Sequence, residues 1–227
     1  MQTFTEKQIY ARYRQKLQSL LEGTGVEQHF HKNDVIELSG DKASYVYLIK
    51  KGCVKQCFIN PVGASKILLL LHPGDLFGEV TLLHGDENYV SSIAHSDLCT
   101  ERIAAKTFWD LAKQEPLLFE YLSAMLACKL RITMAQVYDS SFHTTAQRLQ
   151  HLLLRLSVQS GITQADGIRL SERFTHEDFA QMISAGRSTV TKLLKTFASQ
   201  GYIRLEERTI VVLPALEKAC QTTSTQP

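Results

Sequence analysis

The sequence predicts an α+β protein with an antiparallel β domain first, then one long helix, then a helix-turn-helix domain that carries a β wing. Three patterns support this order: glycines that separate short apolar strands, a helical stretch without glycine, and two short helices followed by two strands. With 227 residues, of which 44% are hydrophobic and 21% charged, the chain suits two modest globular domains. The expected divisions are residues 1–115, 116–139 and 140–227.

An initial helix is expected over residues 2–21, where apolar side chains recur at helical spacing. After it, the pattern changes to short apolar runs bounded by glycines at nearly even intervals. Short strands with regular turn signals are typical of an antiparallel sandwich or barrel. The expected strands are residues 45–49, 54–59 and 66–71, and the glycines are Gly40, Gly52, Gly63 and Gly74.

The long helix is expected from Leu117 to Tyr138, which contains no glycine or internal proline. It has two apolar faces, so one face can pack on the β domain while the other meets the same helix of a second chain. Ser140 and Ser141 are expected to break it, which places the domain boundary near residues 139–143. The stripe expected at the dimer interface is Leu122, Leu126, Leu130, Thr133 and Val137, and the second face is Leu118, Met125 and Ile132.

The helix-turn-helix is expected over residues 174–203. Thr175 is suited to cap its first helix, the second begins at Arg187, and residues 202–213 form the two-stranded wing. Between Phe179 and Leu205 there is no Asp or Glu, so the second helix can approach phosphate without repulsion. The basic residues of that stretch are Arg187, Lys192, Lys195 and Arg204. Before this motif, Thr144 is expected to cap a helix that buries Leu149, Leu152, Leu153 and Leu156.

Four segments of the first domain resemble the cyclic-nucleotide-binding β-roll: Gly40-Asp41, residues 47–52, Gly63 and residues 73–79. With the C-terminal winged helix, the chain resembles the Crp/Fnr family of transcription regulators. The resemblance implies a homodimer that binds a palindromic site in double-stranded DNA, an effector in the β-roll, and contact with RNA polymerase.

The resemblance also implies roles for residues of the second helix. Arg187 matches an arginine that reads guanine, and Ser188 stands where the family commonly has a glutamate that accepts from cytosine. Lys192 matches a basic position that contacts bases or phosphate. Thr189 and Thr175 match phosphate contacts. Lys195 lies deeper in the helix and is read as a phosphate contact or a solvated charge, while Ser184 replaces the family's turn glycine, with Gly186 two positions later.

The effector site departs from the family's cyclic-AMP pattern. Gly78 and Glu79 match the phosphate-binding cassette, but Tyr89 and Val90 stand at the positions of its Arg-Ser pair. No Arg or Lys occurs from Phe77 to Ile93, so a buried phosphate would lack a cationic partner. Cyclic AMP is therefore disfavoured, and Gly78 and Glu79 are read as turn and strand-end residues. The matches to the adenine-contacting pair are Thr133 and Met134, which with Tyr89 suggest a less polar pocket.

Other effectors stay open: a small organic molecule, a cyclic nucleotide held by an atypical phosphate site, or haem. Haem is considered because His72, His84, His95, Cys53 and Cys57 all fall in the first domain, although such cysteines are most often small core residues. Residues 1–52 contain no cysteine, which argues against the iron–sulfur sensors of the family. The five scattered cysteines form no Cys-x-x-Cys pair, so no metal site is suggested.

Catalysis is not expected, because the chain has no nucleophile elbow, no phosphate-binding glycine loop and no His-x-x-x-His pair. A winged helix that binds another protein instead of DNA is a further alternative. The N-terminus shows no signal-peptide core, and the longest aliphatic run, Ile67 to Leu71, is too short to span a bilayer. A cytoplasmic protein without a membrane partner is expected.

Overall fold

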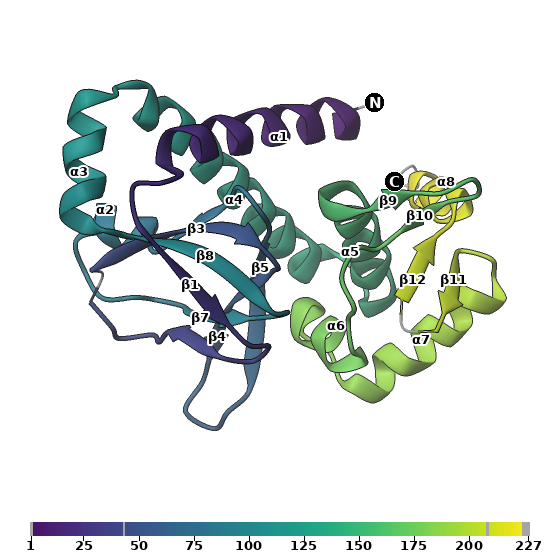
Figure 1. The fold of residues 1–227 in the computed structure, drawn as a ribbon. Coiled ribbons are helices and arrows are strands. Elements are labelled where there is room, and N and C mark those ends of the chain that lie inside the picture. The colour runs from purple at the N-terminus through teal and green to yellow at the C-terminus, as the bar shows by residue number, and fades with distance from the viewer. Residues whose placement is uncertain (1, 43, 208, 224–227) are drawn as a thin grey trace. The chain divides into compact units, whose positions relative to one another are not determined.

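The structure is a computed structural model that describes residues 2–42, 44–207 and 209–223 (Figure 1). The chain divides into two compact units, residues 4–133 and residues 134 onward. Helix α4 (Leu117–Phe142) contributes to both of them. The predicted boundary near residues 139–143 lies further along this helix than the division between the units.

The first unit is built on two antiparallel four-stranded sheets, with strand orders β1-β8-β3-β6 and β2-β7-β4-β5. The antiparallel β domain predicted from the glycine spacing is confirmed, and its three expected strands correspond to β3, β4 and β5. The strands are β1 (Val26–Phe30), β2 (Val35–Glu37), β3 (Tyr45–Lys51), β4 (Val54–Ile59), β5 (Ser65–Leu71), β6 (Leu76–Phe77), β7 (Ser91–Ala94) and β8 (Leu98–Ala104).

Three helices and the first half of α4 complete this unit. They are α1 (Gln2–Leu21), α2 (Glu79–His84) and α3 (Ala105–Gln114). One buried cluster lies among the strands and includes Tyr47 stacked on Phe77 with ring centroids 4.6 Å apart. A second buried cluster lies where the helices pack against the strands of this unit, called the roll below. It consists of Leu17, Leu21, Val46, Leu48, Leu76, Ile103, Phe108, Ala112, Leu118, Tyr121, Leu122 and Met125.

The burial of α4 corrects part of the predicted dimer stripe. Leu122 is 2% exposed in the helix-on-roll cluster, so it presents no free face to a partner helix, and Leu126 is half-buried against the same cluster. Leu130 and Val137 are each 60% exposed, as is Met134 between them. The exposed apolar surface of α4 therefore lies further along the helix than predicted.

The predicted break at Ser140-Ser141 is wrong, since α4 continues to Phe142. The hydroxyls of Ser140 and Ser141 donate to the carbonyl of Val137 at 2.8 and 2.9 Å. A serine side chain that bonds back to the preceding turn is compatible with a helix interior.

The second unit contains α5 (Thr145–Ser160) and the helix-turn-helix pair α6 (His176–Ile183) and α7 (Arg187–Ser199). Both predicted caps are confirmed: Thr144 and Thr175 form capping boxes with Gln147 and Asp178. The four leucines expected inside α5 are buried. The predicted wing consists of β11 (Ile203–Glu206) and β12 (Thr209–Val212). It belongs to a four-stranded sheet of order β11-β12-β10-β9, in which β9 (Ile162–Thr163) and β10 (Ile168–Arg169) were not predicted. Helix α8 (Pro214–Thr223) follows the wing.

Of the helices in the described part of the chain, none combines the length and apolar character needed to cross a bilayer.

Candidate DNA interface and effector pocket

The turn between α6 and α7 is made by Ser184, which adopts the left-handed conformation with φ 53°. Its backbone N–H donates to the Ala180 carbonyl and closes the end of α6. Gly186 has an ordinary φ of −76° and precedes α7 without a side-chain cap. Ser184 itself therefore takes the conformation that glycine would provide at lower cost, and Gly186 does not replace it.

Helix α7 buries one face and exposes the other. Val190, Leu194 and Phe197 are buried against the rest of the unit. The predicted DNA-reading positions lie on the opposite face, and within the described residues no ion pair occupies the basic ones. The exposed positions are Arg187, Ser188, Thr189, Lys192 and Lys195.

Thr175 is exposed at the start of α6, where its hydroxyl lies 2.6 Å from a carboxylate oxygen of Asp178 and accepts from the Asp178 N–H at 3.1 Å. The residue therefore closes the capping box, and its phosphate contact stays a prediction. Its backbone N–H is satisfied by the same carboxylate at 2.8 Å.

A polar chain between the two helices, which the sequence did not predict, involves His176 at the start of α6. Nδ1 of His176 lies 2.7 Å from the Thr191 hydroxyl, which donates to the Arg187 carbonyl at 3.0 Å. Because the hydroxyl proton is used on that carbonyl, the ring N–H is the donor to Thr191. The chain links the first turn of α6 to the first turn of α7.

Arg204, the fourth basic residue of the acid-free stretch, is held within the wing sheet. It forms ion pairs with Asp166, in the turn before β10, and with Glu206, whose Oε1 lies 2.7 Å from the guanidinium. These two carboxylates, Asp166 foremost, raise the pKa of Arg204 above its ordinary value. Its charge is therefore matched inside the protein, in contrast to the three basic residues of α7.

In the roll, Gly78 lies in the turn between β6 and α2, as predicted, whereas Glu79 is the first residue of α2 and not a strand-end residue. Gly78 has φ 86° and precedes α2; a Cβ there would lie 2.5 Å from the Tyr45 carbonyl oxygen. Only glycine fits this combination of backbone conformation and close approach. Glu79, the first residue of α2, is 1% exposed.

Glu79 is paired with a cation that the sequence analysis did not assign to the pocket. Nζ of Lys129, on α4, lies 2.5 Å from Glu79 Oε1 and donates to the Leu76 carbonyl at 2.7 Å. The other oxygen, Oε2, is buried and has no hydrogen-bond partner among the residues that the structure describes. One carboxylate oxygen of Glu79 therefore keeps its capacity to accept a hydrogen bond.

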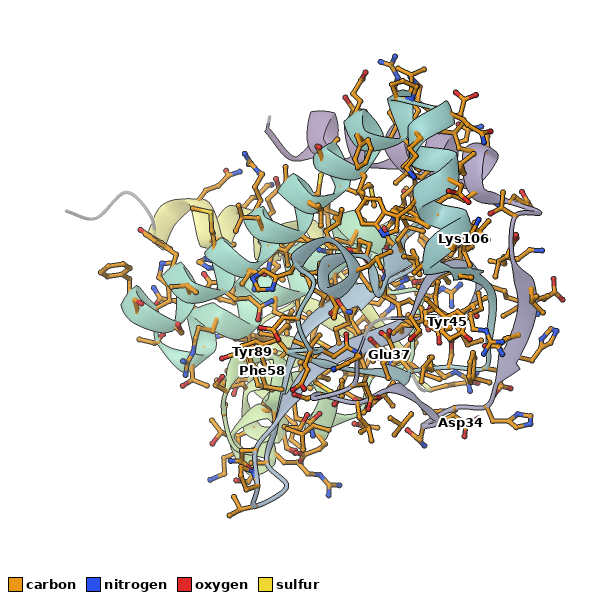
Figure 2. The ribbon with its side chains drawn as sticks, turned by 90° about the vertical axis from the view of Figure 1, so that its left-hand side faces the viewer. Asp34, Glu37, Tyr45, Phe58, Tyr89 and Lys106 are labelled. Atoms are coloured by element: carbon orange, nitrogen blue, oxygen red, sulfur yellow. The ribbon has the colours of Figure 1, made fainter. Side chains whose placement is uncertain are left out.

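A second carboxylate, Glu37 at the end of β2, lies close to Glu79. Its Oε2 accepts from the Ser92 hydroxyl at 3.1 Å. Burial, and to a smaller extent the charge of Glu79, raises the pKa of Glu37 to about 7. Figure 2 shows Glu37 near Tyr45 on this side of the roll. A lone glutamate in the short apolar run Val35-Ile-Glu was the only sequence signal for it.

The other predicted pocket residues are less enclosed. Tyr89 is 80% exposed and meets Phe58 edge to face at a centroid separation of 5.3 Å (Figure 2). Val90 and Thr133 are half-buried, and the Thr133 hydroxyl donates to the Lys129 carbonyl at 3.0 Å. Met134 is exposed. Within the described residues, no hydrogen bond or ion pair joins the side chains of these four residues to Glu37 or Glu79.

The residues considered for haem are mostly part of the roll's interior. Cys53, Cys57, His72 and His95 are buried, whereas His84 is exposed at the end of α2. Burial raises the pKa of the Cys57 thiol and lowers the pKa of His72 to about 4. Both side chains are therefore uncharged near neutral pH, and haem ligation by them stays a hypothesis.

Comparison with known proteins agrees with this two-part architecture. Residues 27–115 match the cyclic nucleotide-binding domain, and residues 147–219 match the Crp-like helix-turn-helix domain. The chain is 31% identical over 189 residues to the cAMP-activated global transcriptional regulator CRP of Pasteurella multocida, covering 81% of this chain and 90% of that protein. It is 27% identical over 183 residues to the CRP-like cAMP-activated global transcriptional regulator of Mycobacterium tuberculosis, with coverages of 81% and 82%.

Solved structures share the fold. FixK2 from Bradyrhizobium japonicum superposes with a TM-score of 0.76 at 21% identity, over 87% of this chain and 96% of that chain. A CooA mutant from Carboxydothermus hydrogenoformans gives 0.75 at 20% identity, over 89% and 88%. Together, a sensor-type roll and a winged helix-turn-helix define a DNA-binding transcription regulator and not an enzyme. The chain belongs to the Crp/Fnr family of transcription regulators.

Proposed function

We propose that the chain is a homodimeric regulator that binds a palindromic DNA site through α7 and responds to an effector other than cyclic AMP. The observation that carries the DNA part is the exposed first turn of α7, which contains Arg187, Ser188 and Thr189. Side chains at the N-terminus of such a helix reach base edges in the major groove. A regulator of this kind works on chromosomal DNA in the cytoplasm, and contact with RNA polymerase is its expected output.

The dimer is supported by the exposed apolar face of α4. Leu130, Met134 and Val137 follow one another at spacings of four and three, which places them on one side of the helix. Large exposed apolar side chains in a contiguous row mark an interaction surface, and a two-fold pair of helices covers such a face on both chains. A dimer also presents two recognition helices to a two-fold symmetric site.

Oligomeric state tests this interface. Met134→Glu is expected to convert the dimer to a monomer in sedimentation equilibrium, because each chain would bury an unpaired charge at the contact. Leu117→Glu is the matched control, since Leu117 is also exposed on α4 but lies on a different side of the helix. Equal mass for both variants and for the parent protein would place the interface elsewhere.

The charges around Glu79 support the proposal that the effector is not cyclic AMP. The relatives named above are cAMP-activated, so cyclic AMP is the natural second candidate. Here Lys129 is already paired with Glu79, and Glu37 adds a second carboxylate nearby. A phosphate anion placed beside these carboxylates would lose its hydration without a free cation to replace it.

Two measurements on the purified full-length chain test the proposal. Selection of duplexes from a random pool is expected to recover a two-fold symmetric sequence. Titration calorimetry with cyclic AMP is expected to show no binding at micromolar concentration, and a micromolar affinity would overturn the effector assignment while leaving the DNA assignment intact. A visible Soret band on the same preparation would instead support the haem alternative.

A further inference from the structure

At the corner between α4 and α5, two histidine side chains contact the carboxylate of one aspartate. Asp139 lies in the last turn of α4 and is 6% exposed. Its Oδ1 is 3.0 Å from Nδ1 of His143, in the link between the helices, and 2.8 Å from Nδ1 of His151 on α5. All three residues belong to the second unit, so this arrangement is internal to one compact body.

The three atoms have the spacing of ligands around one ion. Oδ1 and the two Nδ1 atoms all lie within 4.8 Å of one another. Ligand bonds of about 2.0 to 2.2 Å in tetrahedral geometry place neighbouring donor atoms roughly 3.3 to 3.6 Å apart, slightly further than the two hydrogen-bond distances given above. The two imidazole rings meet at 82° with centroids 4.5 Å apart, so both present Nδ1 to the same point. A small shift of these side chains would admit a cation.

The surrounding groups resemble the outer partners that orient metal ligands. Arg155 binds the other carboxylate oxygen, Oδ2, at 2.5 Å and leaves Oδ1 to face the histidines. The Cys220 thiol of α8 interacts with His151 as well. Outer hydrogen bonds of this kind fix the orientation of the carboxylate and ring that coordinate a metal. The side chains of His143 and His151 are 21% and 23% exposed, which leaves a route from solvent and room for a water ligand.

We propose that Asp139, His143 and His151 form a binding site for a divalent transition metal of the zinc class. Imidazole and carboxylate donors suit zinc, cobalt and nickel, and three protein ligands leave a fourth position for water. The bound ion would join the end of α4 to α5 and fix the corner between the predicted dimer helix and the DNA-binding fold. This site is separate from the effector pocket.

Glu27, His29 and Cys99, on neighbouring strands β1 and β8, form another group with suitable donors. There Glu27 is already bound to Lys50 at 2.9 Å, and the side chains of Glu27 and His29 are 50% and 73% exposed. This group is less enclosed than the α4–α5 corner. It serves as the competing location in the test.

The test uses the full-length chain, freed of metal with a chelator and titrated with Co²⁺. One Co²⁺ per chain is expected, with d–d absorption in the visible range and displacement by Zn²⁺. His143→Ala and His151→Ala should each weaken Co²⁺ binding at least about tenfold. His176→Ala, which removes a histidine elsewhere in the same unit, and Cys99→Ser, which disrupts the competing group, should leave binding unchanged.

Circular dichroism of each metal-free variant shows whether it is folded, and the conservative His151→Gln replaces His151→Ala if that variant is not. Unchanged Co²⁺ affinity in both folded corner variants would overturn the proposal. Loss of binding in Cys99→Ser alone, or no binding by the parent chain at millimolar Co²⁺, would overturn it equally.

Discussion

The ammonium of Lys129 on α4 lies 2.5 Å from Oε1 of Glu79, the first residue of α2, and the two side chains are only 7% and 1% exposed. Removing one partner of such a pair leaves an uncompensated buried charge, whereas removing both charges together costs much less. Lys129→Met is therefore expected to lower the free energy of unfolding by about 3 to 5 kcal/mol. Urea unfolding measures this loss.

The control is the double variant Lys129→Met with Glu79→Gln, which should recover most of the lost stability. A double variant as unstable as the sum of the two single variants would show that the pair is not coupled.

Glu37 gives the roll a pH-dependent stability. Its pKa is about 7 in the folded chain against an ordinary 4.5, so the folded state binds the proton more tightly than the unfolded state does. The contribution of the protonated acid is fully present below pH 4.5 and is lost as the pH rises through 7. Glu37→Gln should remove this dependence and raise the stability at pH 8 by about 1 to 3 kcal/mol relative to the parent chain. Unfolding curves at pH 5 and pH 8 compare the two proteins, and parallel changes in both would contradict the assignment.

Ser184 carries a conformational cost that glycine would relieve. Its φ of 53° lies in the left-handed region, which is unfavourable for a residue with a Cβ. Ser184→Gly is expected to stabilise the chain by about 0.5 to 1 kcal/mol, since the greater freedom of glycine in the unfolded state offsets part of the gain. Ala185→Gly, next in the chain and without a positive φ, should destabilise it in the same thermal denaturation assay.

A substitution at Arg187 tests whether this side chain recognises a base in the DNA site. Arg187→Ala is expected to cost about 1 to 3 kcal/mol on the selected site and much less on random duplex, because a guanine contact contributes only where guanine is present. Fluorescence anisotropy on both duplexes gives the two losses. Lys195→Ala is the comparison, expected to weaken binding to both duplexes alike, as a phosphate contact does.

Local patterns predicted much of the fold. The capping boxes at Thr144 and Thr175 set helix starts through residues three apart, and the glycine intervals marked the strands of the roll. The two apolar faces of α4 were both visible, but spacing alone does not decide which face packs on the roll. Leu122 was therefore assigned to the dimer, although its burial places it in the core.

The sites depend on contacts between distant residues, which periodicity does not reveal. Lys129 meets Glu79 across 50 positions, and His151 meets Asp139 only because the chain turns a corner after Phe142. Asp139 and His143, four residues apart, carried a weak signal at helical spacing. The His-x-x-x-His pattern does not include this pair, because its first member is an aspartate.

The ion pairs of Arg204 with Asp166 and Glu206 also bear on how DNA binding would respond to salt. Each phosphate neutralised by a lysine or arginine releases condensed counterions, and the logarithm of the binding constant falls with the logarithm of salt concentration by about 0.9 per phosphate contact. A guanidinium already neutralised by its own protein releases few counterions on binding. Among the basic residues of the recognition motif, only Arg187, Lys192 and Lys195 should therefore contribute to the salt dependence of DNA binding. Shape and base contacts should then provide a larger share of the binding free energy than the number of basic residues suggests.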